Sequence, residues 1–136
     1  MSKTVLLVDD SRTALMLQKM MLAKTGFEVL TATDGRAAID LAKQRDPDLI
    51  VMDVMMPKLN GIDAVRHLRA DPNFRDTPII MVTTRSEAFS VNEGYAAGCT
   101  DYMTKPFNGA ELVAKINRHL GFEDDEAEAR STEVRR

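Results

Sequence analysis

Short apolar runs alternate along this chain with longer stretches in which apolar residues recur every three or four positions. The runs lie at about 4–8, 27–32, 49–53, 78–82 and 101–103. Their length and β-branched content predict strands, and the spacing in the longer stretches predicts amphipathic helices. Strands and helices that alternate in this way form a parallel sheet between helices, and strands buried on both faces read as continuous apolar runs. The pattern therefore predicts an α/β domain.

Local residues indicate where the helices begin and end. Ser11 and Asp34 can cap the first two helices, because their side-chain oxygens can accept hydrogen bonds from free backbone amides. We expect these helices to end at Gly26 and at the Asp46-Pro47 pair. Turn-forming residues at 56–61 predict a loop after the third strand. We expect a fourth helix with few large apolar residues at about 86–97 and a fifth helix from about Asn108.

Length and composition are those of one compact domain. The chain has 136 residues, of which 44% are hydrophobic, and this is enough to bury a core. A net charge of −3 gives no support to nucleic-acid binding, which usually needs a basic patch. The single Cys99 rules out an intramolecular disulfide, and no stretch approaches the ~20 apolar residues of a membrane span. We expect a cytoplasmic protein that binds neither nucleic acid nor a membrane directly.

The composition changes after residue 121. Residues 122–136 contain six acids and three arginines with almost no apolar residue to bury. Such a segment cannot offset the entropy lost on ordering. We expect one domain at 1–121, followed by a polar acidic tail at 122–136 that is disordered.

Three carboxylates are expected to meet at one edge of the sheet. Asp9 and Asp10 follow the first apolar run, and Asp53 ends the third. If these runs are neighbouring parallel strands, repulsion among the acids would raise their pKa values unless a cation neutralises them. The sequence therefore predicts a hard divalent metal. One such acid alone would more simply be a helix cap.

Hydroxyl and ammonium groups follow two further strands. Thr83 and Thr84 come after the fourth run, and Lys105 comes after the fifth. Ligands of open parallel sheets bind beyond the carboxyl ends of the strands. Carboxylates, a lysine and a threonine around one point suit a phosphoryl group, with Mg²⁺ holding its oxygens against the acids. Taken singly, Lys105 reads as a solvated lysine and Thr83 as a turn residue.

Together these residues resemble the receiver domains of two-component response regulators. The resemblance covers residues 3 to about 121 and is nearest to the small stand-alone chemotaxis-type regulators. It implies a flavodoxin-like fold, a doubly wound five-stranded parallel sheet of order 2-1-3-4-5 with five helices. The matching motifs are Val8-Asp9-Asp10-Ser11, Asp53-Val54-Met55-Met56-Pro57 with Asn60-Gly61, Val82-Thr83-Thr84, and Asp101-Tyr102-Met103-Thr104-Lys105-Pro106-Phe107.

The resemblance also implies roles for the residues of the site. Asp53 resembles the nucleophile that takes a phosphoryl group from a phosphohistidine on a histidine kinase or a histidine phosphotransfer protein. Asp10, Asp53 and the backbone carbonyl of Met55 would bind Mg²⁺, and Asp9 would act mostly through a bound water. Lys105 would stabilise the charge on the transferred group. The Lys105-Pro106 bond resembles the cis bond of this family.

The resemblance further implies a switch. A phosphoryl group on Asp53 would draw the Thr83 hydroxyl inward, and Tyr102 would turn from exposed to buried. This reshapes the face formed by the fourth helix, fifth strand and fifth helix, which binds a downstream protein. Met55 and Arg85 occupy positions that tune the loss of the phosphoryl group, and we expect slow autodephosphorylation because Met55 cannot orient a water.

More than one function is compatible with these residues. The leading interpretation is a stand-alone phosphoacceptor for chemotaxis, motility or a phosphorelay, a signalling domain rather than an enzyme. An alternative is a receiver excised from a larger regulator with a DNA-binding or enzymatic output domain. A phosphatase with an aspartate nucleophile would instead carry that residue in an Asp-x-Asp motif on the first strand. On the first helix, Leu15 and Met16 could belong to an apolar patch that docks the phosphodonor.

Overall fold

A computed structural model describes residues 2–56, 58–84 and 88–121, with the backbone alone at 88–90. The expected tail at 122–136 therefore lies outside the described residues, as does Arg85. The elements, in chain order, are β1 (Thr4–Val8), α1 (Arg12–Met21), β2 (Glu28–Ala32), α2 (Gly35–Arg45), β3 (Leu49–Asp53), α3 (Gly61–Arg69), the 3₁₀ helix η1 (Pro72–Phe74), β4 (Ile79–Thr83), α4 (Ala88–Ala97), β5 (Asp101–Thr104) and α5 (Gly109–Leu120).

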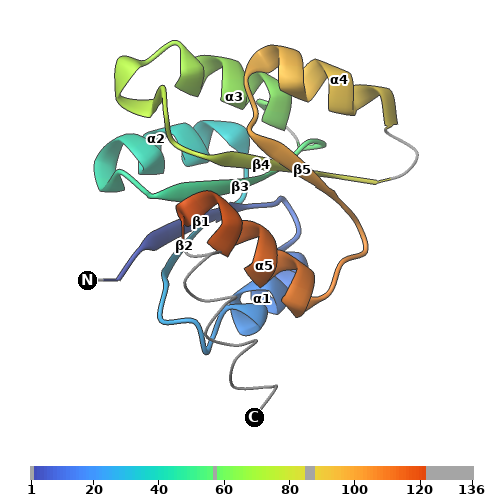
Figure 1. Cartoon of the computed structure of the whole chain (residues 1–136). Coiled ribbons are helices and arrows are strands. Elements are labelled where there is room, and N and C mark those ends of the chain that lie inside the picture. The colour runs from blue at the N-terminus through green and yellow to red at the C-terminus, as the bar shows by residue number, and fades with distance from the viewer. Residues whose placement is uncertain (1, 57, 85–87, 122–136) are drawn as a thin grey trace.

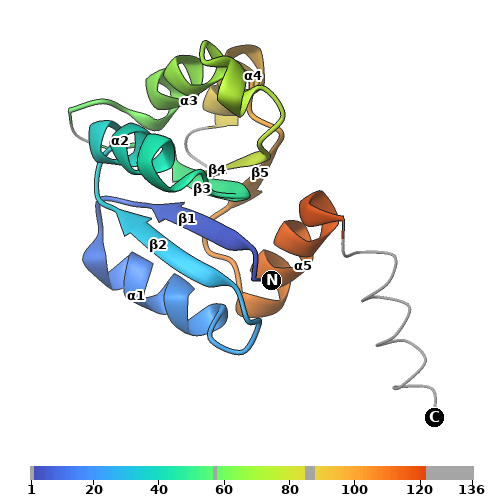
Figure 2. The same ribbon diagram turned by 90° about the vertical axis from the view of Figure 1, so that its left-hand side faces the viewer.

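The five strands form one parallel sheet in the order β2-β1-β3-β4-β5. Helices α1 and α5 cover one face of this sheet, and α2, α3 and α4 cover the other (Figures 1 and 2). Strands β1, β3 and β4 are buried along almost their whole length because helices lie on both sides. The α/β fold and the strand order are confirmed, and each expected strand boundary is correct to within one residue.

Alternating side chains of the strands divide the core into two clusters. Leu6 and Ile50 point toward α2, α3 and α4, whereas their neighbours Leu7 and Val51 point toward α1 and α5. This alternation follows from the two-residue repeat of a strand. The sheet is thus packed on both faces, and the polar residues that follow its strands lie at its carboxyl edge. Among the described helices, none combines the length and the apolar character needed to cross a membrane.

Side-chain caps begin the helices. The side chains of Ser11, Asp34, Asn60 and Asn108 each accept a hydrogen bond from the backbone N–H three residues later. Such caps satisfy amides that have no partner within the helix. The last three cap residues are each followed by a glycine at the first helical position.

Helix α1 departs from expectation in two ways. It ends at Met21 rather than near Gly26, because the N–H of Leu22 binds the carbonyls of Gln18 and Lys19 and closes the last turn. Leu15, expected to share an exposed patch with Met16, is buried at 5% exposure, whereas Met16 is 63% exposed. Gln18 lies on the same buried face as Leu15. Because Gln18 is polar, the buried face of α1 is hard to recognise in the sequence.

Candidate functional site

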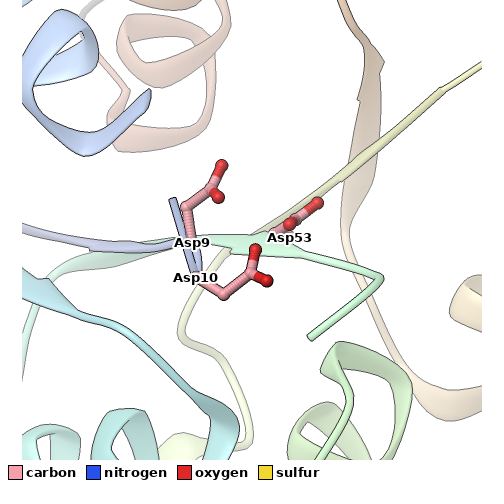
Figure 3. A group of neighbouring side chains, drawn as sticks. All are labelled: Asp9, Asp10 and Asp53. Atoms are coloured by element: carbon pink, nitrogen blue, oxygen red, sulfur yellow. The ribbon is translucent and has the colours of Figure 1, made fainter. Parts of the chain in front are cut away.

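Asp9, Asp10 and Asp53 converge beyond the carboxyl ends of β1 and β3. The two strands are paired, with Val8 opposite Met52, so the residues that follow them meet at the same edge. One carboxylate oxygen from each of the three residues lies within 4.8 Å of the others. Figure 3 shows the side chains projecting from the strand ends, with the carboxylate of Asp10 directed toward Asp53. The predicted meeting of the three acids is found in the structure.

The three carboxylates have different surroundings. Asp9 is 1% exposed, and its oxygens accept hydrogen bonds from the Ser11 N–H at 2.9 Å and from Lys105 at 2.8 Å. Asp53 is also buried, but Asp10 is exposed to solvent. Asp10 and Asp53 thus offer carboxylate oxygens within 4.8 Å of each other, at an edge where Asp10 is open to solvent. Hard oxygen ligands of this kind, few in number and open to water, fit Mg²⁺.

Lys105 brings one positive charge to these acids. Its Nζ lies 2.8 Å from Oδ2 of Asp9 and 3.8 Å from Oδ1 of Asp53. Partial burial works to lower the pKa of Lys105, but the hydrogen bond with Asp9 and the charges of Asp53 and Asp10 outweigh it and raise the pKa. The lysine is therefore a fixed cation. Three carboxylates that share one sheet edge with a lysine form a set of oxygen ligands that suits a divalent cation.

The backbone holds Lys105 at the strand edge. Its N–H donates to the carbonyl of Thr83 at 2.7 Å, and the Lys105-Pro106 peptide bond is cis, the form that the resemblance implied. Thr83 itself is buried at the end of β4, beside Thr104 of β5. The hydroxyl of Thr83 donates to the carbonyl of Thr84 at 3.2 Å.

Met55 lies in the loop between β3 and α3, two residues after Asp53. The loop is closed at its base by a 2.9 Å hydrogen bond from the N–H of Gly61 to the carbonyl of Val54. The side chain of Met55 is exposed. Its backbone carbonyl is the atom that the resemblance assigns to the metal, whereas the expected tuning residue Arg85 lies outside the described residues.

Two tyrosines mark the face expected to bind a partner. Tyr102 of β5 is 38% exposed and packs edge-to-face on Tyr95 of α4, with ring centroids 6.0 Å apart. A groove next to Tyr102 runs between β5 and α5 and is lined by Thr104, Glu111, Lys115 and Arg118. Tyr102 thus lies exposed beside this groove.

A second charged cluster was not foreseen from the sequence. His119 and Lys115 of α5 both contact Asp101 at the start of β5, at 2.7 Å and 3.4 Å. Burial works to raise the pKa of Asp101, but hydrogen bonds from His119 and the Tyr102 N–H and the Lys115 charge lower it. The four-residue spacing of Lys115 and His119 places both on one helix face and was the available clue. The contact of His119 with Asp101 thus ties α5 to β5.

Comparison with known proteins identifies the family. The family model for the response regulator receiver domain matches residues 5–117. The alkaline phosphatase synthesis transcriptional regulatory protein PhoP of Bacillus subtilis is 41% identical over 120 residues, which are 88% of this chain and 49% of PhoP. The transcriptional regulatory protein CpxR of Escherichia coli is 46% identical over 116 residues, 85% of this chain and 48% of CpxR. The chain spans about half the length of these curated relatives.

Solved structures agree in fold. The chemotaxis protein CheY4 of Vibrio cholerae matches with a TM-score of 0.82 at 36% identity, over 87% of this chain and 98% of CheY4. The receiver domain of the sensor histidine kinase PA1611 of Pseudomonas aeruginosa, solved with a magnesium ion in its active-site cleft, matches with a TM-score of 0.82 at 34% identity, over 89% of this chain and 99% of that domain. With its motifs, its strand order and its acidic edge, the chain belongs to the response regulator receiver domain family.

Proposed function

We propose that the chain is a signalling receiver that accepts a phosphoryl group on Asp53 from a phosphohistidine of a histidine kinase or histidine phosphotransfer protein. The observation that carries this proposal is the meeting of Asp53 with Asp9, Asp10 and Lys105 at one sheet edge, with the carboxylate oxygens within 4.8 Å of one another and Lys105 3.8 Å from Asp53. An Oδ atom of Asp53 forms a bond to phosphorus while the bond from phosphorus to the histidine nitrogen breaks.

Each neighbouring residue has a part in this transfer. Asp10, Asp53 and the Met55 carbonyl would hold Mg²⁺, which neutralises the oxygens of the incoming group. Asp9 keeps Lys105 charged and in place through their 2.8 Å contact. Lys105 in turn neutralises the phosphoryl oxygens that face away from the metal site. The ionised carboxylate attacks without a general base, and the electron pair of the broken P–N bond stays on the histidine, which leaves as a neutral imidazole protonated on its other ring nitrogen.

The same proposal covers the output of the switch. Thr83 lies at the end of β4, and Tyr102 lies on the adjacent strand β5. A phosphoryl group that draws the Thr83 hydroxyl toward Asp53 would leave room into which Tyr102 turns. The face formed by α4, β5 and α5 then changes shape and recruits a downstream protein, as expected of a chemotaxis, motility or phosphorelay regulator.

A second candidate is the receiver part of a longer regulator. PhoP and CpxR are named as transcriptional regulators, and this chain spans about half of each. An open reading frame that continues past residue 136 into a DNA-binding or enzymatic domain would favour this candidate. Direct binding of the 136-residue chain to a motility or phosphorelay protein after phosphorylation would favour the stand-alone regulator.

Phosphorylation by acetyl phosphate tests the chemistry without the donor protein. We expect the protein to incorporate a phosphoryl group, as measured by intact mass. This incorporation should require Mg²⁺ and should disappear in Asp53→Asn. Asp40→Asn, an exposed aspartate on α2, is the matched control and should be labelled like the wild type. Labelling of Asp53→Asn, or none of the wild type with Mg²⁺, would contradict the proposal. Turnover of small phosphate esters would instead indicate a phosphatase.

A further inference from the structure

The first turn of α2 lies directly against the loop between β3 and α3. Gly35 is the first residue of α2, and a Cβ built on it would lie 2.2 Å from the carbonyl oxygen of Leu59 and 3.0 Å from its carbonyl carbon. These are backbone atoms, so no change of rotamer could make room. An alanine at position 35 would have to push the loop away by roughly 1 Å to restore ordinary van der Waals contact.

Other contacts join the same two segments. Oδ1 of Asp34 accepts a hydrogen bond from the Ala37 N–H at 2.8 Å and caps α2, while its Oδ2 lies 3.7 Å from Nζ of Lys58 in the loop. Leu59 is partly buried against the core cluster on the α2 and α3 side of the sheet. The loop therefore contacts α2 through the Asp34–Lys58 pair, and the packing of Leu59 against the core opposes its displacement.

The far end of this loop rests on the strand that carries Asp53. A Cβ built on Gly61 would lie 2.1 Å from the carbonyl oxygen of Asp53, and the Gly61 N–H binds the Val54 carbonyl. The loop is thus short, closed at its base and in contact with α2 through Leu59. Met55 and Leu59 belong to this one loop, four positions apart.

We propose that Gly35 is a positioning residue for the Mg²⁺ site. Its lack of a side chain lets the loop lie close enough to α2 to hold the Met55 carbonyl where Asp10 and Asp53 can share an ion with it. Mg²⁺ demands near-octahedral geometry with ligands at about 2.0–2.1 Å, so it is sensitive to a small shift of one carbonyl. This role depends on the proposed function, in which the Met55 carbonyl is a ligand.

Mg²⁺ affinity of the unphosphorylated protein, measured by calorimetry, tests the role of Gly35 without any turnover. We expect Gly35→Ala to weaken Mg²⁺ binding about tenfold, the loss typical when a residue that orients metal ligands is changed. Gly109→Ala is the matched control, because Gly109 follows the cap of α5 in the same way but would place its Cβ 3.3 Å from the flexible side chain of Met21. It should bind Mg²⁺ within about twofold of the wild type.

A split between affinity and rate separates positioning from general damage. At saturating Mg²⁺, Gly35→Ala should recover most of its rate of phosphorylation by acetyl phosphate, because a high concentration of the ion fills the weakened site. Equal Mg²⁺ affinity in Gly35→Ala and the wild type would overturn the role of Gly35, as would an equal loss in Gly109→Ala. A wild type that binds no Mg²⁺, or an Asp10→Asn variant that binds it fully, would instead refute the proposed function.

The wild-type protein offers a second test that no misfolded variant can obscure. During a Mg²⁺ titration followed by amide NMR, the Gly35 resonance should move together with that of Gly61. Gly26 lies just before β2, at the amino edge of the sheet, with no atom within 4 Å of a built Cβ, and its amide should stay in place. A Gly35 amide as still as that of Gly26 would contradict contact between α2 and the metal-binding loop.

Discussion

At the scale of single residues, the site depends on which way neighbouring acids point. The sequence predicts that Asp9 and Asp10 both reach the sheet edge, but not that one is buried against Lys105 and the other open to solvent. Successive side chains at a strand end leave on opposite sides, so two adjacent aspartates receive different environments. The buried one, Asp9, contacts Lys105, which lies ninety-six positions away along the chain, so local sequence does not reveal this partner.

We expect one residue, Met55, to influence the lifetime of the phosphoryl group. Its exposed thioether lies two positions after Asp53 and cannot orient a water for attack on phosphorus. We expect Met55→Asn to shorten the half-life of the phosphorylated protein several-fold, because an amide both donates and accepts hydrogen bonds to water. Decay followed by intact mass in EDTA-free buffer measures it. Met55→Leu should keep the slow rate, and an unchanged or longer half-life in Met55→Asn would contradict the role.

Asp101 should make stability depend on pH in the acid range. The contacts with His119 and Lys115 leave the folded-state pKa of Asp101 below its unfolded value of about 3.9. A lowered pKa means that the contribution to stability is present above the unfolded pKa and is lost as the pH falls through the folded pKa. Urea unfolding should therefore show Asp101→Asn less stable than the wild type at neutral pH, with the two converging below about pH 4.

The control for this pH dependence is Asp40→Asn, which corrects for the loss of one negative charge at an exposed position. A difference between the wild type and Asp101→Asn that stays constant from neutral pH down to acid would show that the ionised carboxylate of Asp101 does not contribute. His119→Gln should reproduce part of the effect, since it removes the 2.7 Å partner.

At the scale of elements, the sequence predicts the bounds of a helix or strand best where the apolar pattern and the capping residues indicate the same position. The strands and the caps of α1 and α2 were predicted from residues that act locally. The predicted end of α1 was wrong because the helix stops at Met21, well before the next glycine. There the N–H of Leu22 donates to backbone carbonyls of the last turn. The 3₁₀ helix η1 was missed because its single turn has no apolar period and depends on the Asp71 cap before Pro72.

The outer face of α1 makes a prediction about the phosphodonor. Met16, Leu17 and Met20 are its exposed apolar residues, whereas Leu15 faces the core. An exposed apolar patch of this kind suits docking of helices from a histidine phosphodonor. Met16→Glu and Met20→Glu should each slow phosphotransfer from the cognate phosphorylated kinase at least about tenfold, as expected for loss of interface anchors.

Two controls separate docking from chemistry. Labelling of Met16→Glu by acetyl phosphate should equal that of the wild type, because Asp53 and its neighbours are unchanged. Gln44→Glu adds the same charge at an exposed position of α2, on the other face of the sheet, and should leave phosphotransfer intact. Equal phosphotransfer by the wild type, Met16→Glu and Met20→Glu would place the donor on another surface.

At the scale of the whole molecule, the sheet links the proposed phosphorylation site to the face of α4, β5 and α5. Asp53 pairs with Val82 of β4, and Thr83 pairs with Thr104 of β5, so two backbone ladders join Asp53 to the strand of Tyr102. The sequence predicted this order of strands through its motifs. It could not predict the edge-to-face contact of Tyr95 and Tyr102, since the approach of α4 to β5 depends on tertiary packing.

This link can be measured by tyrosine emission alone. The chain has two tyrosines and no tryptophan, so Tyr95 and Tyr102 supply all of its intrinsic fluorescence above that of phenylalanine. We expect Mg²⁺ with beryllofluoride, a phosphoryl mimic, to change this emission in the wild type because Tyr102 turns inward and leaves the ring of Tyr95. Asp53→Asn cannot form the adduct and should show no change.

Two variants assign the emission change to the switch. Thr83→Ala removes the hydroxyl that we expect to be drawn toward the phosphoryl group. This variant should bind beryllofluoride, as seen by ¹⁹F NMR, yet show a much smaller change in emission. Tyr102→Phe should lose the change altogether and keep Tyr95 as a steady reference. If the wild type forms the adduct while its emission stays constant, Tyr102 does not move, and the output of this receiver must leave from another face.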